Sequence, residues 1–515
     1  QNTKQKDLIM PKTPSRKLFD LIKSLSPAEK RYFKVYANKK NESKNKYLTL
    51  FDAIESQQAF DDEKLIMKVY GDQTITSRKY SELKGYLFDV ILKTLQSYDE
   101  RSSVFNKISN IMSNVDVLFK RGHMQFCKDE LRKAKKLATE YEDFTTLYEI
   151  LKWEKWIAHT MMDVDFLNTE LDRIATEESQ YVEQLILLSQ YRNLFLELYL
   201  KIKSGGKVAE VQHIIDNKLL KQNKFKSHRT HVICYRAKAL MAHIQMDDDA
   251  FQDYSRELIR IMESKPHFLK VEVSEYISAL HNYCVSCSSK RDYDELFVAN
   301  EKMKTIVPLN MDDRLKIYRQ YKQVYFSWSI KTGEFEKAKE SLKEHFKTIG
   351  TFKTKSFDDH QFYFHYAYIH FGCGDYDNAL YYLNNWLNLP NTIDNPNLQM
   401  LSRVFNLILH YELGNIILLE SLIKSTYRFL KRGNHLHEME KAFLSFINSL
   451  TKAQSKKAQL ACFQKFKNQL LMISNNSEAR ISSFDLMAWV DSKLLNMDFA
   501  EIVKNNLHKQ RQHAA

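Results

Sequence analysis

The sequence predicts an all-α protein, built as an α-solenoid in which helical hairpins follow one another along the chain. Only 11 Gly and 7 Pro occur among 515 residues, and hairpin turns, loops and parallel sheets all need such residues. The chain is also longer than the size at which one compact core keeps growing, so several domains or an extended repeat array is expected. A hydrophobic fraction of 44% is ample for a folded core.

A pattern of a turn residue, a polar residue and a large apolar residue recurs through the chain. Its first residues in the C-terminal half are Arg291, Gly333, Gly374 and Gly414, which lie 42, 41 and 40 residues apart. The same step leads back through four further positions, Asp249, Gly206, Asp163 and Gly122. Breakers such as Pro308 fall about midway between these turns, where they would end a helix of about 25 Å. The recurrence predicts about eight or nine helical hairpins over residues 100–475.

Residues 363–390 resemble a tetratricopeptide repeat (TPR). The resemblance rests on the Gly374-Asp375-Tyr376 turn, the small residue Ala379 three positions later and the closing Pro390. It implies a right-handed TPR-like solenoid in which the first helix of each hairpin lines the inner surface. The period near 41 residues departs from the 34 residues of the family, so the helices are expected to be longer.

The two ends differ from the repeats. We expect residues 1–13 to form a tail, residues 14–99 a basic helical cap domain, and residues 476–515 C-terminal capping helices and a tail. Within the N-terminal domain, Ser26, Pro27 and Glu29 form a strong helix start, with Ser as N-cap and Glu closing a capping box. Apolar spacing predicts helices near 15–24, 27–38, 45–57, 62–70 and 77–97.

Charge and cysteine content limit the classes of function. The formal net charge is +13, and residues 1–48 hold 13 Lys and Arg against four acidic residues. Such a basic end favours polyanionic partners or a solvated surface. Six cysteines in so long a chain do not indicate a disulfide framework, and no window holds 18 uninterrupted apolar residues. We therefore expect a cytoplasmic protein without membrane insertion.

The sequence lacks recognisable catalytic motifs. It has no phosphate-binding glycine loop, and Cys284 and Cys287 form a single CxxC without two further ligands nearby. His360, His365 and His370 are five residues apart, which does not produce the i, i+4 pair of a zinc protease. We expect no catalytic residues, no cofactor and no metal, and hence a protein that is not an enzyme.

On the TPR frame, polar residues of the first helices are candidates for an inner groove that binds a peptide or protein segment. They are Arg236, His243, His281, Asn282, Gln320, Gln323, Gln361, His365 and Tyr368. The strip is nearly neutral, so it suits hydrogen bonding better than phosphate binding. A merely solvated groove is the alternative.

Two basic stretches are candidates for anion binding; the alternative is a solvated edge for the first and a purely structural cap for the second. Their residues are Lys221, Lys224, Lys226, Arg229, Arg78, Lys79 and Lys84. The last three lie at a predicted helix start, where a recognition helix would present them.

Two functions remain open from the sequence. The first is a non-enzymatic scaffold or adaptor that holds a partner protein or peptide in the solenoid groove. The alternative is a nucleic-acid-linked regulator, in which the basic N-terminal domain contacts DNA or RNA and the repeats sense a partner or peptide.

Overall fold

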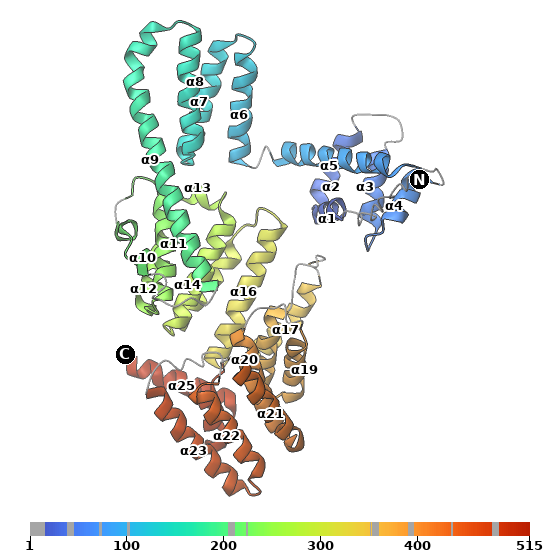
Figure 1. Ribbon diagram of the computed structural model, residues 1–515, viewed down its shortest axis with the longest axis vertical. Helices are drawn as coiled ribbons and strands as arrows, with labels where there is room; N and C mark the ends of the chain where they lie inside the picture. Colours follow the sequence, from blue (N-terminus) through green and yellow to red (C-terminus); the bar gives the residue numbers. More distant parts are fainter. Residues whose placement is uncertain are drawn as a thin grey trace, which may run out of the picture. The chain divides into compact units, whose positions relative to one another are not determined.

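Helices are the only regular secondary structure among the described residues (Figure 1). The computed structural model describes residues 16–38, 46–71, 75–99, 103–203, 212–222, 225–350, 352, 360–389, 396–433, 436–475 and 484–514. The predicted tail, residues 1–13, lies outside them. The chain divides into unit 1 (residues 1–245 and 260–272) and unit 2 (residues 246–259 and 273–515). Each unit is described by itself.

Five helices form the N-terminal part of unit 1, with bounds within two residues of those expected. They are α1 (Lys17–Ser24), α2 (Pro27–Asn38), α3 (Lys46–Ser56), α4 (Asp62–Tyr70) and α5 (Ser77–Asp99). The predicted capping box is present: the Ser26 N–H donates to Glu29 Oε2 at 2.6 Å, and the Glu29 N–H donates to Ser26 Oγ at 3.3 Å. Phe33 and Phe51 stack at the centre of the hydrophobic core that these helices enclose.

Further helices follow in unit 1. They are α6 (Val104–Phe119), α7 (Met124–Glu140), α8 (Phe144–Thr160), α9 (Val164–Lys203), α10 (Gln212–Ile215), η2 (Lys218–Lys221) and α11 (His228–Ile244). Among them, α6 packs on α7, α7 on α8, α8 on α9 and α9 on α11. Helix α12 (Asp248–Glu263) begins in unit 2 and ends in unit 1, and α13 (Pro266–Leu269) follows it.

Helix α9 corrects the expectation of separate hairpins throughout. It runs without a break for 40 residues, through the position where a mid-repeat turn was expected. The reason is in the sequence, because residues 164–203 contain neither Gly nor Pro, the residues that would interrupt a helix. The N-terminal half of α9 packs on α8 and its C-terminal half on α11.

Left-handed residues occupy the turns between paired helices. Those nearest the predicted turns are Gly122, Met162, Met246, Arg291, Gly333, Gly374 and Gly414, all with positive φ; Glu142, between α7 and α8, has positive φ as well. Six of those seven coincide with, or directly precede, a predicted turn residue, and Met246 lies three residues before Asp249. Gly206 lies outside the described residues. Non-glycine residues adopt this conformation at a cost of about 1 kcal/mol, which is why composition alone does not reveal such turns.

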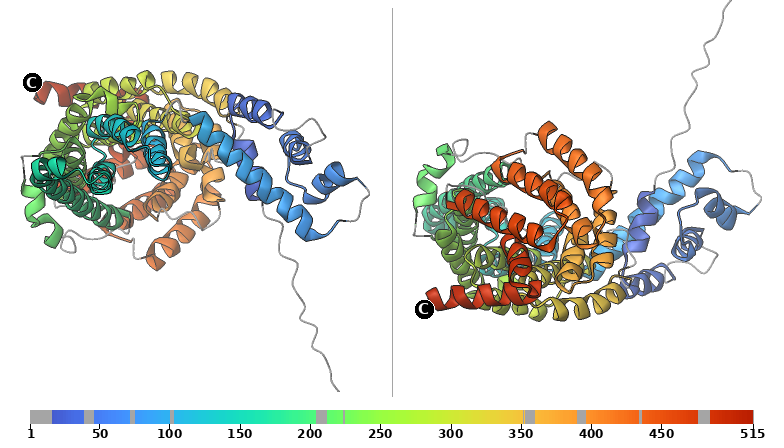
Figure 2. Two further views of the ribbon diagram at one scale, coloured as in Figure 1. Left: turned by 90° about the horizontal axis from the view of Figure 1, so that it is seen from above. Right: turned by 90° about the horizontal axis from the view of Figure 1, so that it is seen from below.

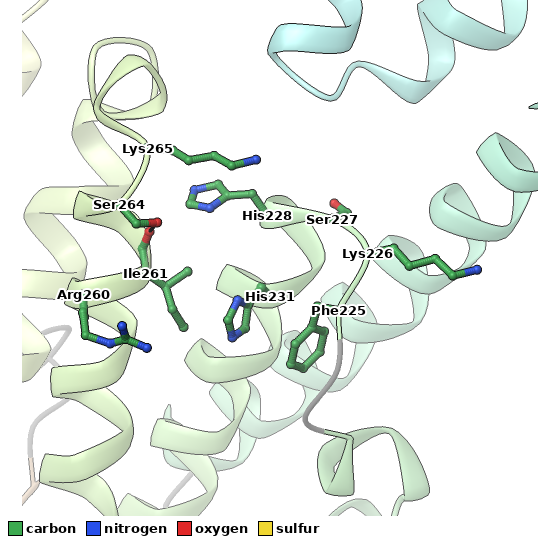
Figure 3. A pocket seen from close by; sticks show the side chains of 9 residues that line it. All are labelled: Phe225, Lys226, Ser227, His228, His231, Arg260, Ile261, Ser264 and Lys265. Atoms are coloured by element: carbon green, nitrogen blue, oxygen red, sulfur yellow. Dashed lines mark hydrogen bonds between the residues drawn. The ribbon is translucent and has the colours of Figure 1, made fainter.

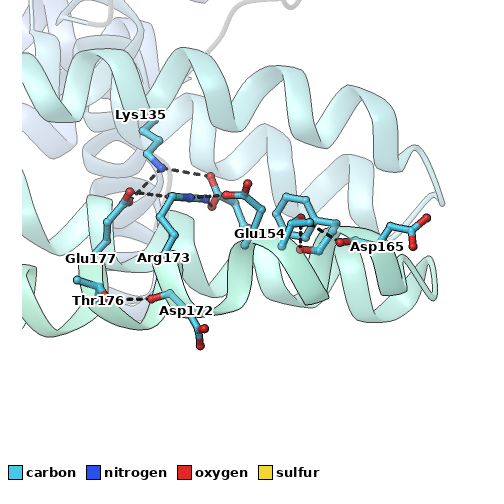
Figure 4. Close-up of polar contacts among 10 residues, drawn as sticks. Lys135, Glu154, Asp165, Asp172, Arg173, Thr176 and Glu177 are labelled. Atoms are coloured by element: carbon cyan, nitrogen blue, oxygen red, sulfur yellow. Dashed lines mark hydrogen bonds and ion pairs between the residues drawn. The ribbon is translucent and has the colours of Figure 1, made fainter.

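An ion-pair network ties α7, α8 and α9 together (Figure 4). Lys135 Nζ lies 3.5 Å from Glu154 Oε1 and 3.3 Å from Glu177 Oε2. Arg173 contacts the same two carboxylates, at 3.4 Å and 2.6 Å. A network of shared, half-buried charges holds helices together more effectively than isolated surface pairs do.

Unit 2 continues the succession of packed helices. They are α14 (Val273–Ser289), α15 (Tyr293–Lys302), η3 (Met303–Thr305), α16 (Met311–Thr332), α17 (Phe335–Ile349), α18 (His360–Gly372), α19 (Tyr376–Leu387), α20 (Pro396–Glu412), α21 (Ile416–Arg432), α22 (Glu438–Lys452), α23 (Lys456–Asn475), α24 (Leu486–Leu495) and α25 (Phe499–Ala514). One hydrophobic cluster, rich in Phe and Tyr, extends from Phe326 to Val503.

The C-terminal helices cover earlier hairpins as well as the last one. In α24, Trp489 is buried against Tyr411 and Phe463, and its indole N–H donates to Glu412 Oε1 at 2.6 Å. Helix α25 lies beside α16 (Figure 2). A side chain added at Gly333 would meet the Lys504 side chain at 2.8 Å, so this turn needs glycine both for its positive φ and for the close approach of α25.

Candidate functional site

Three helices of unit 2, each the first of a hairpin, present polar residues at one recurring spacing. In α14, Ser274, Ser278 and His281 are separated by four and three residues. The same spacing relates Lys316, Gln320 and Gln323 in α16, and Gln399, Arg403 and Asn406 in α20. Residues i, i+4 and i+7 share one helix face. All nine are exposed or half-buried, whereas the neighbouring apolar residues are in the core.

The faces on α14 and α16 adjoin. Lys316 Nζ donates to Ser274 O at 2.8 Å, to Ser274 Oγ at 2.7 Å and to Ser278 Oγ at 2.7 Å. Helix α16 also packs against α18, whose half-buried His365 is one of its few residues outside the core. Helix α18 meets α20 through Phe364 and Phe405, whose ring centroids are 5.7 Å apart. We call these nine residues together with His365 the first-helix strip.

Several polar atoms of the strip are buried without a hydrogen-bond partner among the described residues. They are His281 Nδ1, Gln320 Oε1, Arg403 Nε and Asn406 Oδ1. Buried polar groups in folded proteins are nearly always satisfied, and leaving one unsatisfied costs about 1–3 kcal/mol. Their recurrence on three first helices is therefore a property of this face.

The strip combines neutral hydrogen-bonding groups with a few cations. Burial, followed by the nearby Lys316 charge, lowers the pKa of His281 to about 4, so the imidazole is neutral at pH 7 and carries one donor and one acceptor. Arg403 lies over the Phe429 ring at 4.1 Å. Burial and then the Arg432 charge lower the pKa of Arg403, although an arginine remains protonated at neutral pH.

The structure distributes the predicted groove residues over both units. His281, Gln320, Gln323 and His365 belong to the first-helix strip, and Asn282 is exposed beside it on α14. In unit 1, Arg236 lies half-buried with its guanidinium 4.7 Å from the Phe195 ring centroid, and His243 is exposed near the end of α11. The side chain of Gln361 lies outside the described residues.

The prediction that Tyr368 lines the groove is wrong, because the residue is buried. Only 3% of it is exposed, and its hydroxyl accepts the Asp485 N–H at 2.9 Å. It packs against Phe484 and Phe405. The C-terminal segment thus covers the position that was predicted to face a partner, through a contact between residues 117 apart in the chain.

The predicted anion-binding residues are also dispersed. Arg229 is engaged inside unit 1, because its Nε donates to Tyr141 O at 3.0 Å and its Nη2 pairs with Glu272 at 3.3 Å. Lys226 pairs with Glu183 at 3.3 Å, and Lys221 is exposed. Lys224 lies outside the described residues.

In the N-terminal helices, Arg78 is exposed and pairs with Glu82 at 2.9 Å. Lys79 is exposed as well. Lys84 pairs with Asp62 at 3.4 Å and lies over the Tyr80 ring at 4.4 Å. Lys84 is therefore tied to α4, while Arg78 and Lys79 remain at the surface.

Sequence reasoning missed the residues of the strip on α20. Arg403 and Asn406, together with Gln399, carry the same spacing as the triplets on α14 and α16. That spacing was a usable signal, because three polar residues at i, i+4 and i+7 in an otherwise apolar helix mark one solvated face. The same spacing would also have identified Lys316 on α16 and Ser274 and Ser278 on α14, which the sequence analysis did not name.

The described residues contain no group of three or more His, Cys, Asp or Glu that could hold a metal ion. Cys284 and Cys287 are buried in α14, and burial, with the neighbouring carboxylates adding to it, raises the pKa of Cys287 to about 11. A thiol with so high a pKa is a weak nucleophile at neutral pH. Within the described part of the chain, no helix is both long and apolar enough to cross a membrane.

No protein-family model, curated protein or solved structure matches this chain.

Proposed function

We propose that the chain is a non-enzymatic scaffold or adaptor, which holds an extended segment of a partner protein along the first-helix strip of unit 2. The observation that supports the proposal most strongly is the set of four buried polar atoms without partners, on His281, Gln320, Arg403 and Asn406. The side chains that carry these atoms are only half-buried, so they can turn towards a bound segment, which would then satisfy the atoms and recover the free energy that their burial costs.

The chemistry of the strip fits a main chain. An extended peptide presents N–H and C=O groups in alternation, and neutral His, Gln and Asn side chains offer both donors and acceptors. Lys316 and Arg403 are donors only. A segment with acidic side chains, or with a C-terminal carboxylate, would therefore bind better than a basic one.

A TPR-like arrangement also supports this proposal. The left-handed turn residues Arg291, Gly333, Gly374 and Gly414 follow one another at 42, 41 and 40 residues, and α14, α16 and α18 pack in succession. We propose a right-handed solenoid in which these first helices line the inner surface, in a protein that works in the cytoplasm.

Site-specific photo-crosslinking in living cells of the source organism tests the proposal. A photoreactive amino acid at Gln323 should yield one dominant crosslinked protein. The matched position Glu340, exposed on the second helix α17, should yield none of that product. Equal crosslinking at both positions, or none at either, would contradict binding along the strip.

The same preparation separates the scaffold from the nucleic-acid-linked regulator. If the same cells are lysed and treated with nuclease and high salt before irradiation, the Gln323 product should be unchanged, because a hydrogen-bonded protein contact depends little on salt. Loss of the product under these conditions would favour the regulator, with Arg78 and Lys79 as the next residues to change.

A further inference from the structure

Helix α9 carries apolar side chains on its solvent-exposed face along its whole length. Six of them are 40–64% exposed, namely Val164, Leu171, Val182, Ile186, Leu196 and Leu200. A surface helix normally has one apolar face, turned to the core, and polar residues opposite. In α9 the core face is formed by other residues, among them the fully buried Ile174, Tyr191 and Leu198. The exposed apolar residues therefore belong to a second face, of the kind that marks an interaction surface.

The exposed face has the spacing of a coiled coil. Its residues follow one another in steps of four and three, with Glu178 in register between Ala175 and Val182. Two steps of four meet at Val182, which locally unwinds a coiled coil. We call the exposed members the α9 seam, which extends about 54 Å along the helix axis. They are Val164, Asn168, Leu171, Ala175, Val182, Ile186, Ser189, Asn193, Leu196 and Leu200.

The composition of the seam suits contact with another helix. Branched apolar side chains insert between those of a facing helix, and the small Ala175 and Ser189 leave room for its larger residues. An amide at a seam position, as at Asn168 and Asn193, fixes the register of such a pair. Glu178, the one charged residue in register, is already paired with Lys155 of α8 at 2.6 Å.

One flank of the seam is acidic. The charged residues of this flank directly follow apolar seam residues, about 100° further around the helix; they are Asp165, Asp172, Glu183 and Glu197, and at the end one base, Lys201. Asp165 and Asp172 have no ion-pair partner among the described residues, and both point away from the network of α7, α8 and α9 (Figure 4). Glu183 pairs at 3.3 Å with Lys226, which extends outward from the segment before α11 (Figure 3). In a chain of net charge +13, such a row of carboxylates favours a basic partner.

We propose that the α9 seam binds an amphipathic helix of a partner protein, with apolar residues at matching spacing and Lys or Arg on its flank. The apolar residues supply the buried area, and the acidic flank selects for the basic helix. The seam belongs to unit 1, so this site is independent of the first-helix strip. An anionic lipid surface fits less well, because helices that lie on such membranes carry basic residues beside their apolar face.

A second copy of α9 also fits less well. In an antiparallel pair of helices the same flanks meet, which would bring the two acidic rows together. In a parallel pair the acidic flank would meet the opposite one, which is occupied within the chain. There Ile174 is fully buried, and the Tyr181 ring lies 6.2 Å from that of Phe144 on α8. The charge and the packing of the flanks therefore both favour a different, basic helix.

Fluorescence anisotropy with two labelled synthetic peptides tests this proposal on the full chain. Both peptides repeat the spacing of the seam with Leu at the seam positions, one with Lys and the other with Glu on its flanks. The Lys peptide should bind saturably at one site, and the Glu peptide at least about tenfold more weakly. The double variant Leu171→Gln with Ile186→Gln should weaken binding of the Lys peptide at least about tenfold, since it removes apolar area from the seam.

Gln180→Ala is the matched control, because Gln180 is exposed on the same helix but lies about 160° around it from Val182. Binding of the Lys peptide to this variant should change less than about twofold. Both substituted seam residues are exposed, so the thermal midpoint should stay that of the wild type. If the double variant lowers it, the single variants Leu171→Gln and Ile186→Gln replace it, each with an expected loss of about threefold.

The proposal is overturned if the Lys peptide does not saturate, if both peptides bind equally, or if the seam variant and Gln180→Ala bind the Lys peptide alike. Sedimentation of the chain alone should show no dimer that the double variant dissociates. Such a dimer would overturn the proposal in favour of a second copy. Binding to phosphatidylserine vesicles that the double variant abolishes would overturn it in favour of a membrane surface.

Discussion

The two units are stabilised in different ways. In unit 2, one hydrophobic cluster runs from Phe326 to Val503 and includes residues of α24 and α25. In unit 1, the buried apolar residues fall into separate clusters within α1–α5, α6–α8 and α9–α11. Polar contacts such as those of Glu142 with the start of α11 and of Arg173 with Glu154 tie its later helices together.

This difference determines which substitutions and which changes of pH should destabilise each unit. A continuous aromatic core loses stability when a large side chain is removed, because the cavity left behind cannot fully collapse. Helices held by a few half-buried carboxylates are instead sensitive to loss of a charge or to pH. Four predictions follow from this comparison, in order of decreasing effect.

The largest effect should come from Trp489→Ala in unit 2. Trp489 is fully buried and contacts Tyr411, Phe446 and Phe463. Its removal should lower the free energy of unfolding by about 3–5 kcal/mol, measured by urea denaturation. The exposed Met472→Ala should change it by less than about 0.5 kcal/mol. Similar losses in both variants would show that α24 is not part of the core.

The second prediction concerns a buried histidine in the aromatic core. His345 Nδ1 lies 2.8 Å from the Tyr318 hydroxyl and Nε2 lies 2.5 Å from that of Tyr366. Burial, and then the Lys322 charge, lower the pKa of His345 to about 3. Because an unfolded histidine titrates near 6.5, the unfolded chain takes up the proton first as the pH falls.

Unit 2 should therefore keep its full stability above about pH 6.5 and lose up to about 3 kcal/mol by pH 4. Hydrogen exchange of α16–α18 measures this loss. In His345→Gln, the same region should be less stable at pH 7 but should depend less on pH. An unchanged pH dependence in this variant would assign the titration to another group.

The third prediction tests the polar ties of unit 1. Burial would raise the pKa of Glu142, but hydrogen bonds from the Arg229 and His228 N–H groups, Lys265 and Ser227 outweigh it and hold the pKa below its ordinary value. The stability that this carboxylate contributes is present above the unfolded pKa near 4.3 and is lost as the pH falls through the lower folded value. Glu142→Gln should destabilise α11 by about 2 kcal/mol at pH 7.

Hydrogen exchange of the α11 amides measures the change, and Glu183→Gln is the control because it removes an exposed carboxylate of the same unit. If both variants lose equal protection, Glu142 does not hold α11 in place.

The smallest effect should come from Arg511→Gln. Arg511 Nη2 lies 2.7 Å from Asp294 Oδ1, but both side chains are largely exposed. Exposed pairs contribute about 0–1 kcal/mol, so the urea midpoint should hardly move. A loss comparable to that of Trp489→Ala would mean that α25 is anchored by this charge and not by its apolar face.

Local signals predicted much of the fold. The capping box at Ser26 and the turn glycines Gly122, Gly333, Gly374 and Gly414 act through the backbone of their own neighbourhood, so the sequence reveals them. Glu142 and Met162 adopt the same left-handed backbone conformation although they are not glycines. The surrounding structure must stabilise them in it. Composition could not identify these turns.

The candidate site was predicted only in part, because only local features of a helix can be predicted from its own sequence. His281, Gln320, Gln323 and His365 follow from helical spacing. Tyr368 does not, because a segment more than 100 residues away covers it. Contacts between distant segments depend on how whole helices pack, and helical periodicity in one segment carries no information about them.

The most direct test of the scaffold is the affinity of the crosslinked partner for strip variants. The dissociation constant should be measured for wild type, for the double variant Gln320→Ala with Asn406→Ala, and for the control Glu340→Ala. We predict that the double variant binds at least about tenfold more weakly while the control matches wild type. If the double variant folds normally and binds as tightly as wild type, the first-helix strip is not the binding surface.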